Sequence, residues 1–218
     1  MAFHIHLDEN RLEGQIQELI SGIHAKTIPQ RWIITPDATP TNIVSILEEK
    51  GFDNLSAEVP DSEPGMLLWS GEFQPYIVPE DVPIICRKVQ TRAEFSIWVD
   101  VVNTALHGWA MIDAEHYYKW VEMGMAGIYI AEIGGVAVST AATMRNGQTA
   151  SLEFVSTLPE YRRQKAAITL CSKALADLFA DGVEAVTLSG ASEATALYEK
   201  LGFHSCFPNI IMEYKLQD

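Results

Sequence analysis

The fold is decided by the stretch Phe154-Val155-Ser156-Thr157-Leu158-Pro159-Glu160-Tyr161-Arg162-Arg163-Gln164-Lys165-Ala166-Ala167. A strand pattern runs here into a basic turn, and the turn opens directly into a helix pattern from Lys165 to Ala180. The first turn of a helix presents unpaired N–H groups at the positive end of the helix dipole, so it binds phosphates. Arg162 and Arg163 precede that turn and can add charge-assisted hydrogen bonds. The stretch therefore predicts a pyrophosphate site.

A second motif, Leu197-Tyr198-Glu199-Lys200-Leu201-Gly202-Phe203, follows after a further strand pattern. Together the two motifs resemble the GNAT superfamily of acyl-CoA-dependent N-acyltransferases. In that family a Val-x-x-x-Pro-x-Tyr-Arg run leads into an Arg/Gln-x-x-Gly-x-Gly/Ala loop, and a Leu-Tyr-x-Lys-Leu-Gly-Phe element closes the domain. The run is matched from Val155 to Arg162, and the resemblance covers about residue 84 to the C-terminus.

The loop departs from the family pattern at Lys165, which stands where the first glycine is usual. Glycine lets a backbone approach a phosphate closely and adopts positive φ at little cost. Lysine brings a side chain but also a positive charge, so we expect cofactor binding to be retained. The alternative is that Lys165 weakens or abolishes the site.

The resemblance implies acetyl-CoA as the acyl donor and a primary amine as the acceptor, which attacks the thioester directly in a ternary complex. Pantetheine would pair with the backbone of Val155 and Thr157, and the thioester carbonyl would meet an N–H group near Val155. The pyrophosphate would lie over the N–H groups from Arg163 to Ala167. The expected cofactor-binding residues are Phe154, Val155, Thr157, Arg162, Arg163, Gln164, Lys165, Ala166 and Ala167.

Two side chains are candidates for proton transfer. Tyr198 matches the tyrosine that protonates the departing thiolate in many relatives of the family, and the alternative is a core aromatic residue. Glu153 is the candidate base that takes a proton from the ammonium, directly or through water. Strand alternation places Glu153 on the face opposite to Phe154, and the alternative is a glutamate at the surface.

Composition limits the class of protein. The chain has 218 residues and a net charge of −14. Such a charge disfavours nucleic acid as a partner. It would attract a cationic amine, and the alternative is that it only keeps the protein soluble. No apolar run is long enough for a membrane span, and the first residues lack a signal-peptide pattern. No membrane partner is therefore expected. The three cysteines lack metal-ligand spacing, so no metal is expected either, and their odd number fits reduced thiols in a cytoplasm.

The first 83 residues carry 14 acidic and 4 basic side chains and predict a small acidic α+β domain. Helix patterns cover residues 11–24 and 42–50, and short strand patterns cover residues 32–35, 54–59 and 65–69. The sequence Lys50-Gly51-Phe52 after a helix echoes Leu201-Gly202-Phe203, which suggests a degenerate half-repeat of the same fold. Chance similarity around a helix-ending glycine is the alternative.

Residues 84–218 predict the acetyltransferase domain, so the expected division is 1–83 and 84–218 and the expected fold is α+β with a mixed, mostly antiparallel sheet. Strands are expected at residues 84–89, 127–133, 135–144, 149–157 and 185–189, and one last strand or a pair of strands is expected at residues 203–215. Thr91 and Glu94 form a plausible capping box for a helix, and a second helix is expected at residues 113–123. Asn146-Gly147 predicts a tight hairpin turn.

The acceptor pocket of the family is built by the first two helices, their loop and the final strands. Here that region holds residues 106–111 and 204–211, and Trp109, Tyr117, Tyr118 and Trp120 are candidates to line it or to form plain core. The acceptor itself cannot be chosen by fold analogy. Besides an N-acetyltransferase, possibilities are a silent CoA-binding regulatory module and an interaction protein with a lapsed CoA site. A homodimer is a further possibility.

Overall fold

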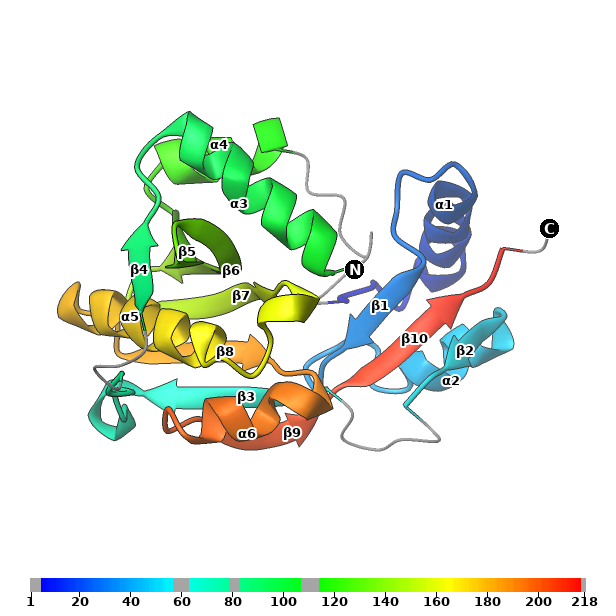
Figure 1. Cartoon of the computed structure of the whole chain (residues 1–218). Helices are drawn as coiled ribbons and strands as arrows, with labels where there is room; N and C mark the ends of the chain where they lie inside the picture. The colour runs from blue at the N-terminus through cyan, green and yellow to red at the C-terminus, as the bar shows by residue number, and fades with distance from the viewer. Residues whose placement is uncertain (1–4, 57–62, 79–82, 107–113, 217–218) are drawn as a thin grey trace. The chain divides into compact units, whose positions relative to one another are not determined.

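A computed structural model describes residues 5–56, 63–78, 83–106 and 114–216 of the chain. Its elements form a mixed α+β structure, as the sequence predicted (Figure 1). The helices are α1 (Leu12–His24), α2 (Ile43–Glu49), α3 (Arg92–Ala105), α4 (Ala114–Glu122), α5 (Ala166–Ala180) and α6 (Thr195–Glu199), with short 3-10 turns at Ser70–Glu72, Pro159–Tyr161 and Ser192–Ala194. The strands are β1 (Arg31–Ile34), β2 (Phe52–Asn54), β3 (Pro64–Trp69), β4 (Ile84–Lys88), β5 (Ala126–Ile133), β6 (Val136–Asn146), β7 (Thr149–Thr157), β8 (Ala185–Ser189), β9 (His204–Pro208) and β10 (Ile210–Tyr214).

The strands form two sheets. The larger sheet has the order β4-β5-β6-β7-β8-β3-β9, and the smaller sheet has the order β1-β10-β2. Strands β4 to β7 are antiparallel neighbours, whereas β7 and β8 are parallel. The predicted mixed, mostly antiparallel sheet is therefore confirmed.

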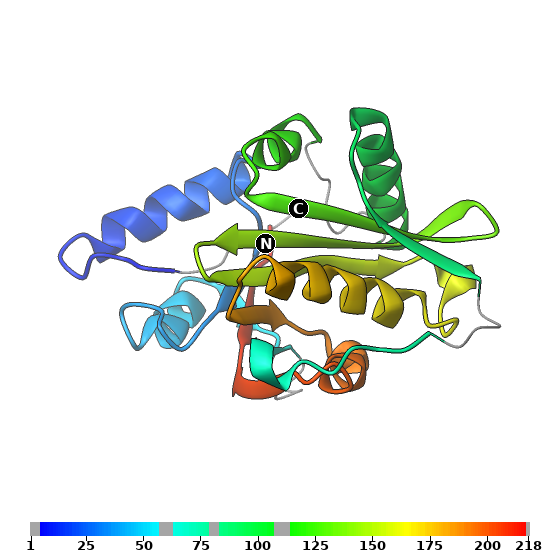
Figure 2. The same cartoon turned by 90° about the vertical axis from the view of Figure 1, so that its left-hand side faces the viewer.

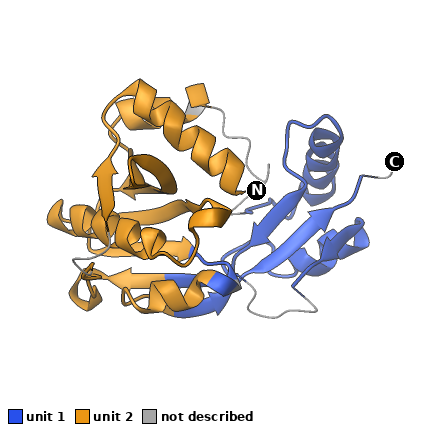
Figure 3. Cartoon of the chain, in the orientation of Figure 1, with its two compact units in different colours: residues 1–66, 189–193, 205–218 blue, residues 67–188, 194–204 orange. Residues whose placement is uncertain are grey.

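Two compact units emerge from the contacts of the chain. One comprises residues 1–66, 189–193 and 205–218, and the other comprises residues 67–188 and 194–204 (Figure 3). The C-terminal strand β10 thus belongs to the unit that contains the N-terminus. The boundary between these contact-based units does not lie at residue 83. The expected domains 1–83 and 84–218 stay a prediction.

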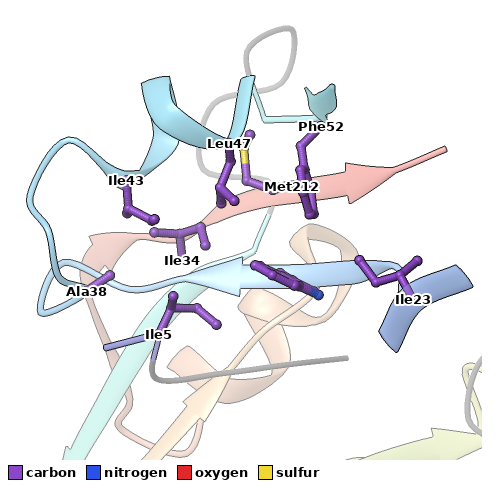
Figure 4. Packing of buried hydrophobic residues seen from close by; sticks show 9 residues of the cluster. Ile5, Ile23, Ile34, Ala38, Ile43, Leu47, Phe52 and Met212 are labelled. Atoms are coloured by element: carbon purple, nitrogen blue, oxygen red, sulfur yellow. The ribbon is translucent and has the colours of Figure 1, made fainter. Parts of the chain in front are cut away.

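The smaller unit has a core of its own, in which side chains from α1, β1, α2, β2 and β10 meet (Figure 4). Trp32, Leu47 and Met212 are fully buried there. The ring of Trp32 lies 4.8 Å from that of Phe52, at a tilt that suits aromatic packing. Strand β10 lies in the centre of the three-stranded sheet, so β1 and β2 both depend on it.

The larger unit is built in three layers (Figures 1 and 2). Helices α3 and α4 cover one face of its sheet, and α5 covers the other face. Helix α3 begins with the predicted capping box, in which Thr91 and Glu94 bond each other's backbone N–H groups. Its buried face contributes Phe95, Trp98 and Val102 to the core.

Two sequence predictions differ from the observed elements, and one alternative is decided. The strand expected at residues 54–59 is β2 at Phe52–Asn54, and residues 57–62 lie outside the described part. The strand expected at 65–69 is β3, which pairs within the large sheet between β8 and β9. The last segment, expected to form one strand or a pair, forms the two strands β9 and β10, and these belong to different sheets.

Candidate active site

The edge of β7 that faces β8 is paired over only part of its length. The parallel register joins Thr149, Ala150 and Ser151 to residues of β8 and extends no further in the described chain. On the opposite edge, the Leu158 N–H donates to the Val138 carbonyl of β6 at 2.9 Å. Because antiparallel strands alternate, the backbone groups of Thr157 then point away from β6, toward the unpaired edge.

A β-bulge marks the place where this edge becomes free. The register between β6 and β7 shifts between Thr140 and Ala142, opposite Phe154 and Val155. Phe154 has a φ of +49°, in the left-handed region that a bulky side chain rarely adopts. Such strain persists where surrounding contacts enforce it and is frequent at functional sites.

Side chains satisfy the backbone groups that the bulge leaves without ladder partners. The Thr140 hydroxyl donates to the Phe154 carbonyl at 2.9 Å. The indole N–H of Trp98, a fully buried residue, donates to the Ala141 carbonyl at 3.2 Å. The bulge is therefore held by α3 and β6, and it fixes where Glu153 and Phe154 point.

Three aromatic rings pack around the bulge. The ring of Phe154 lies edge-on to Trp98, with centroids 5.7 Å apart, and to Tyr117 of α4, with centroids 5.2 Å apart. Trp98 and Tyr117 lie 6.2 Å apart. Edge-to-face packing at these distances stabilises a fixed arrangement. The rings therefore anchor α3 and α4 to the bulged strand.

Glu153 and Tyr198, the two proton-transfer candidates, interact electrostatically in this unit. Burial raises the pKa of the Glu153 carboxyl, and a hydrogen bond with the Ser151 side chain opposes this only in part. Tyr198 of α6 is buried, and burial, the Cys171 thiol and Glu153 together raise the pKa of its phenol. Burial and the charge of Glu153 likewise raise the pKa of Tyr117 to about 12. One carboxyl group thus acts on two tyrosines that remain protonated at neutral pH.

The loop from β7 to α5 has an unusual backbone. Arg163 has a φ of +61°, and Lys165, the residue before the first helical position of α5, has a φ of +67°. Both values lie in the left-handed region, which glycine adopts without steric cost. Lys165 therefore adopts a backbone conformation that suits glycine, the residue usual at this place in the family pattern.

The first turn of α5 is open and positively charged at its approach. No side chain caps it, and it contains no acidic residue. Arg162, Arg163, Gln164 and Lys165 are exposed, whereas Ala166 is buried under the loop. Uncapped N–H groups beside three cationic side chains form an arrangement that holds an anion. The Arg162 side chain also makes a long contact, 3.4 Å, from Nε to the Thr157 carbonyl.

The predicted residues therefore fall into two groups in the larger unit. Glu153, Phe154, Val155 and Thr157 lie on the free edge of β7, and residues 162–167 form the loop and helix start that follow. Sequence reasoning missed Trp98 and Thr140, which hold the bulge; an apolar helix position and a strand threonine gave no signal for that role. Residues 107–113, including Trp109, lie outside the described part.

Within the described residues, no group of three metal-ligating side chains occurs. No described helix combines the length and the apolar character that a membrane span needs.

Comparison with known proteins gave matches by family and by structure. The model of the "Acetyltransferase (GNAT) family" matches residues 91–203. A GCN5-related N-acetyltransferase from Kribbella flavida is similar in structure, with a TM-score of 0.71 at 16% identity, over 98% of this chain and 79% of the other. A second such protein, from Sphaerobacter thermophilus, has a TM-score of 0.66 at 17% identity, over 93% and 66%.

A tandem GNAT protein from the clavulanic acid biosynthesis pathway is also similar, with a TM-score of 0.61 at 13% identity, over 97% of this chain and 73% of the other. A search of curated protein sequences gave no match. At these identities the structural likenesses concern the fold alone. The half-repeat in the first 83 residues stays a prediction.

Proposed function

Because the chain belongs to the acetyltransferase (GNAT) family, we propose that it is an N-acetyltransferase that moves an acetyl group from acetyl-CoA to a primary amine. Family and fold support acyl transfer in general. The observation that carries the finer proposal is the loop before α5. Its left-handed residues Arg163 and Lys165 bring the open helix turn and three cationic side chains together.

The residues present fit acyl-CoA as the donor substrate. The free edge of β7 at Val155 and Thr157 offers backbone groups to an extended pantetheine amide, as an added strand would use them. The N–H groups from Arg163 to Ala167 and the side chains of Arg162, Arg163 and Lys165 would hold the pyrophosphate. A backbone N–H at the bulge, near Val155, would polarise the thioester carbonyl.

Glu153 is the base in this proposal. Burial raises the pKa of its carboxyl and so brings that pKa closer to the working pH, which favours proton transfer. A carboxylate there accepts a proton from the incoming ammonium, which frees the nitrogen lone pair. The nitrogen then forms a bond with the acetyl carbon, and the carbon–sulfur bond breaks. The nitrogen releases its second proton to water, which leaves a neutral amide, and the Tyr198 oxygen regains a proton from water after it has protonated the thiolate.

Tyr198 is the acid. Its hydroxyl has no hydrogen-bond partner among the described residues, and like an ordinary phenol it carries its proton at neutral pH. It can therefore donate that proton to the departing thiolate. Most of the rate would come from alignment of the two bound substrates rather than from these groups.

A paired assay tests this assignment. Tyr198→Phe keeps the buried ring and removes the hydroxyl, so the rate of thiol release in the presence of amine should fall about 10²-fold or more, while acetyl-CoA affinity is unchanged. A variant with unchanged turnover contradicts the role of Tyr198. Wild-type protein that binds acetyl-CoA but acetylates no amine would favour the silent regulatory module instead.

The cellular setting is part of the proposal. All three cysteines, Cys86, Cys171 and Cys206, are free thiols, which agrees with a reducing cytoplasm. The partners would be acetyl-CoA and an amine, with neither nucleic acid nor membrane involved. A homodimer stays a proposal, which rests only on an edge strand in the C-terminal region, such as β9 at the edge of the larger sheet.

A further inference from the structure

Helix α6, which carries Tyr198, is too short to hold its own position. It spans Thr195–Glu199, no side-chain hydrogen bond caps its first turn, and neither its first nor its last turn carries a charge that favours the helix. A helix of this length is not stable by itself, so contacts with the rest of the unit must place it. The position of the Tyr198 hydroxyl therefore depends on what holds the helix.

The residues that end α6 are bonded directly to Tyr198. The N–H groups of Leu201 and Phe203 both donate to the Tyr198 carbonyl, at 2.9 and 3.1 Å. The ring of Phe203, which is fully buried, lies edge-on to the Tyr198 ring, with centroids 5.9 Å apart. Gly202 joins the two donors and has a φ of +100°. A shift of this turn is therefore passed on to Tyr198.

A segment from a distant part of the chain contacts this turn. A Cβ atom added at Gly202 would lie 2.3 Å from the Glu72 carbonyl oxygen and 3.1 Å from Leu68 Cδ1, so the glycine packs against the segment without room for a side chain. The Gln74 N–H donates to the Leu201 carbonyl at 3.0 Å. We call residues 68–74 the clamp segment.

The clamp segment is itself fixed on its other sides. It continues from β3, which lies between β8 and β9 in the larger sheet (Figure 1). The Ser70 N–H donates to the Glu184 carbonyl, directly before β8, at 2.8 Å. The Phe73 ring packs on Phe179 of α5, with centroids 5.2 Å apart. Strand pairing and helix packing together therefore make the segment a firm support for the turn that ends α6.

The clamp segment lies outside residues 91–203, which the family model matches. We propose that this segment holds the turn at Gly202 and thereby positions Tyr198. The inference rests on the proposed acetyltransferase function, in which Tyr198 is the acid. The clamp residues are positioning residues, because they act through α6 and not on the reacting atoms. Proton transfer requires hydrogen-bond reach to the thiolate, so a displacement of about 1 Å would remove much of the effect of Tyr198.

The substitution Gly202→Ala tests the contact. The added methyl group would meet the Glu72 carbonyl, so the turn must shift. We expect kcat for thiol release from acetyl-CoA to fall about tenfold or more, while the KM for acetyl-CoA stays within about twofold. The acceptor is whichever of n-butylamine, lysine and spermidine the wild-type protein acetylates fastest.

The matched control is Gly182→Ala in the same unit. Gly182 has a φ of +83°, and no atom beyond its chain neighbours lies within 4 Å of an added Cβ. The control therefore carries a similar backbone strain without the contact. Equal kcat values for the two variants would overturn the proposal.

A double substitution separates positioning from a general loss of structure. If Gly202→Ala acts through the Tyr198 hydroxyl, it should lower kcat by less than about threefold when Tyr198→Phe is already present. A merely structural role would lower kcat by the same factor in both backgrounds. That result would reject positioning of Tyr198 by the clamp segment.

A second pair of variants tests the clamp without straining Gly202. Gln74→Pro removes the N–H that donates to Leu201, and Phe73 before it has the extended backbone that a following proline requires, with φ −61° and ψ 125°. Gln74→Ala keeps this N–H. We expect kcat to fall about threefold or more in Gln74→Pro and to stay within about twofold in Gln74→Ala. Equal kcat values for this pair would contradict the proposal.

Hydrogen exchange separates this inference from the proposed function. The amides of Leu201 and Phe203 should exchange about tenfold faster in Gly202→Ala than in Gly182→Ala, and faster in Gln74→Pro than in Gln74→Ala. This result in a protein that transfers no acetyl group would keep the clamp and reject the transferase. Unchanged exchange at both amides in an active protein would reject the clamp and keep the transferase.

Discussion

At the scale of single residues, the candidate site depends on groups held in costly states. Phe154 and Lys165 adopt left-handed backbone conformations, each of which costs about 1–2 kcal/mol for a residue with a Cβ atom. Glu153 is a carboxyl whose charged form is disfavoured by burial. Such costs are tolerated where function requires them, because substitutions that relieve them also remove function.

Glu153 links activity and stability to pH. Its folded-state pKa is raised above 4.5, so the folded protein binds this proton more tightly than the unfolded chain does, and stability falls as pH rises from 4.5 through the raised value. Glu153→Gln removes this decrease in stability, so the variant should be more stable than wild type at neutral pH. The difference in stability between the two proteins should disappear below pH 4.5. Its turnover should drop about 10²-fold or more. Thermal melts and thiol-release rates across pH 4 to 8 measure both effects.

The wild-type rate should also decrease on acidification at a higher pH than an ordinary glutamate would give. Tyr117 and Tyr198, the two phenols on which the charge of Glu153 acts, are neutral over this range as ordinary phenols are. A variant that is less stable than wild type at neutral pH, or a rate that stays constant down to pH 4, contradicts the role of Glu153.

Lys165 combines a backbone cost with a useful charge, and two substitutions separate them. Lys165→Ala keeps the backbone cost and removes the charge, so acetyl-CoA affinity should fall several-fold to about tenfold with little change in stability. Lys165→Gly should lose the same affinity and gain up to about 1 kcal/mol of stability. Calorimetry and thermal melts distinguish them. Unchanged or tighter acetyl-CoA binding by both variants would mean that the lysine contributes nothing to the site.

At the scale of elements, the bulge of β7 organises the site because three neighbours enforce it. The bonds from Thr140 and Trp98 satisfy the carbonyls of Phe154 and Ala141, and the aromatic rings of Trp98 and Tyr117 pack against Phe154. A register shift in the middle of a long strand pair both frees an edge and redirects a side chain. The bulge is thus the common cause of the free edge of β7, where a substrate could pair, and of the placement of Glu153.

The substitution Trp98→Phe tests whether the bulge depends on these contacts. It removes the indole N–H and leaves the Ala141 carbonyl without that donor in a buried position, which costs about 1–3 kcal/mol. For a chain of this length, the melting temperature should fall by about 3–10 °C. The control is Trp69→Phe, because Trp69 is 51% exposed and should tolerate the change. Equal melting temperatures for the two variants would show that the bond to Ala141 does not support the bulge.

The sequence predicted the elements of the site better than their distortions. It predicted the bounds of β7 and β8, the capping box at Thr91 and the start of α5 to within a residue, because apolar patterns and caps act locally. The bulge at Phe154 has no local signal, since phenylalanine does not favour positive φ and long-range contacts impose it. The left-handed conformation of Lys165 could not be predicted either, because a glycine at that position would have indicated positive φ, whereas a lysine does not.

At the scale of the whole chain, its two ends contribute to one core. Strand β10 pairs with β1 and β2, and the Leu55 N–H donates to the Ile211 carbonyl at 2.8 Å. A sequence divided at residue 83 gives no reason for this pairing, because partner choice between strands far apart in the chain is decided by tertiary packing. The same reason explains why β3 was expected in the smaller unit but pairs within the larger sheet.

Met212→Ala tests this arrangement. Met212 is fully buried in the centre of the three-stranded sheet, and truncation of such a side chain costs about 2–5 kcal/mol. We expect faster hydrogen exchange at the backbone amides of β1 and Leu55. Met123→Ala is the control, because Met123 is 69% exposed. Unchanged exchange at β1 would contradict the central place of β10.

The central claim is that the loop before α5 holds an acyl-CoA, and titration of the protein with acetyl-CoA by calorimetry tests it most directly. We expect micromolar binding that weakens about tenfold when Arg162 or Arg163 is replaced by alanine, and stays within about twofold in the control Gln164→Ala. No heat and no thermal shift at millimolar acetyl-CoA would contradict the claim. The site would then be a lapsed one, and the acidic N-terminal residues would become the place to seek a partner.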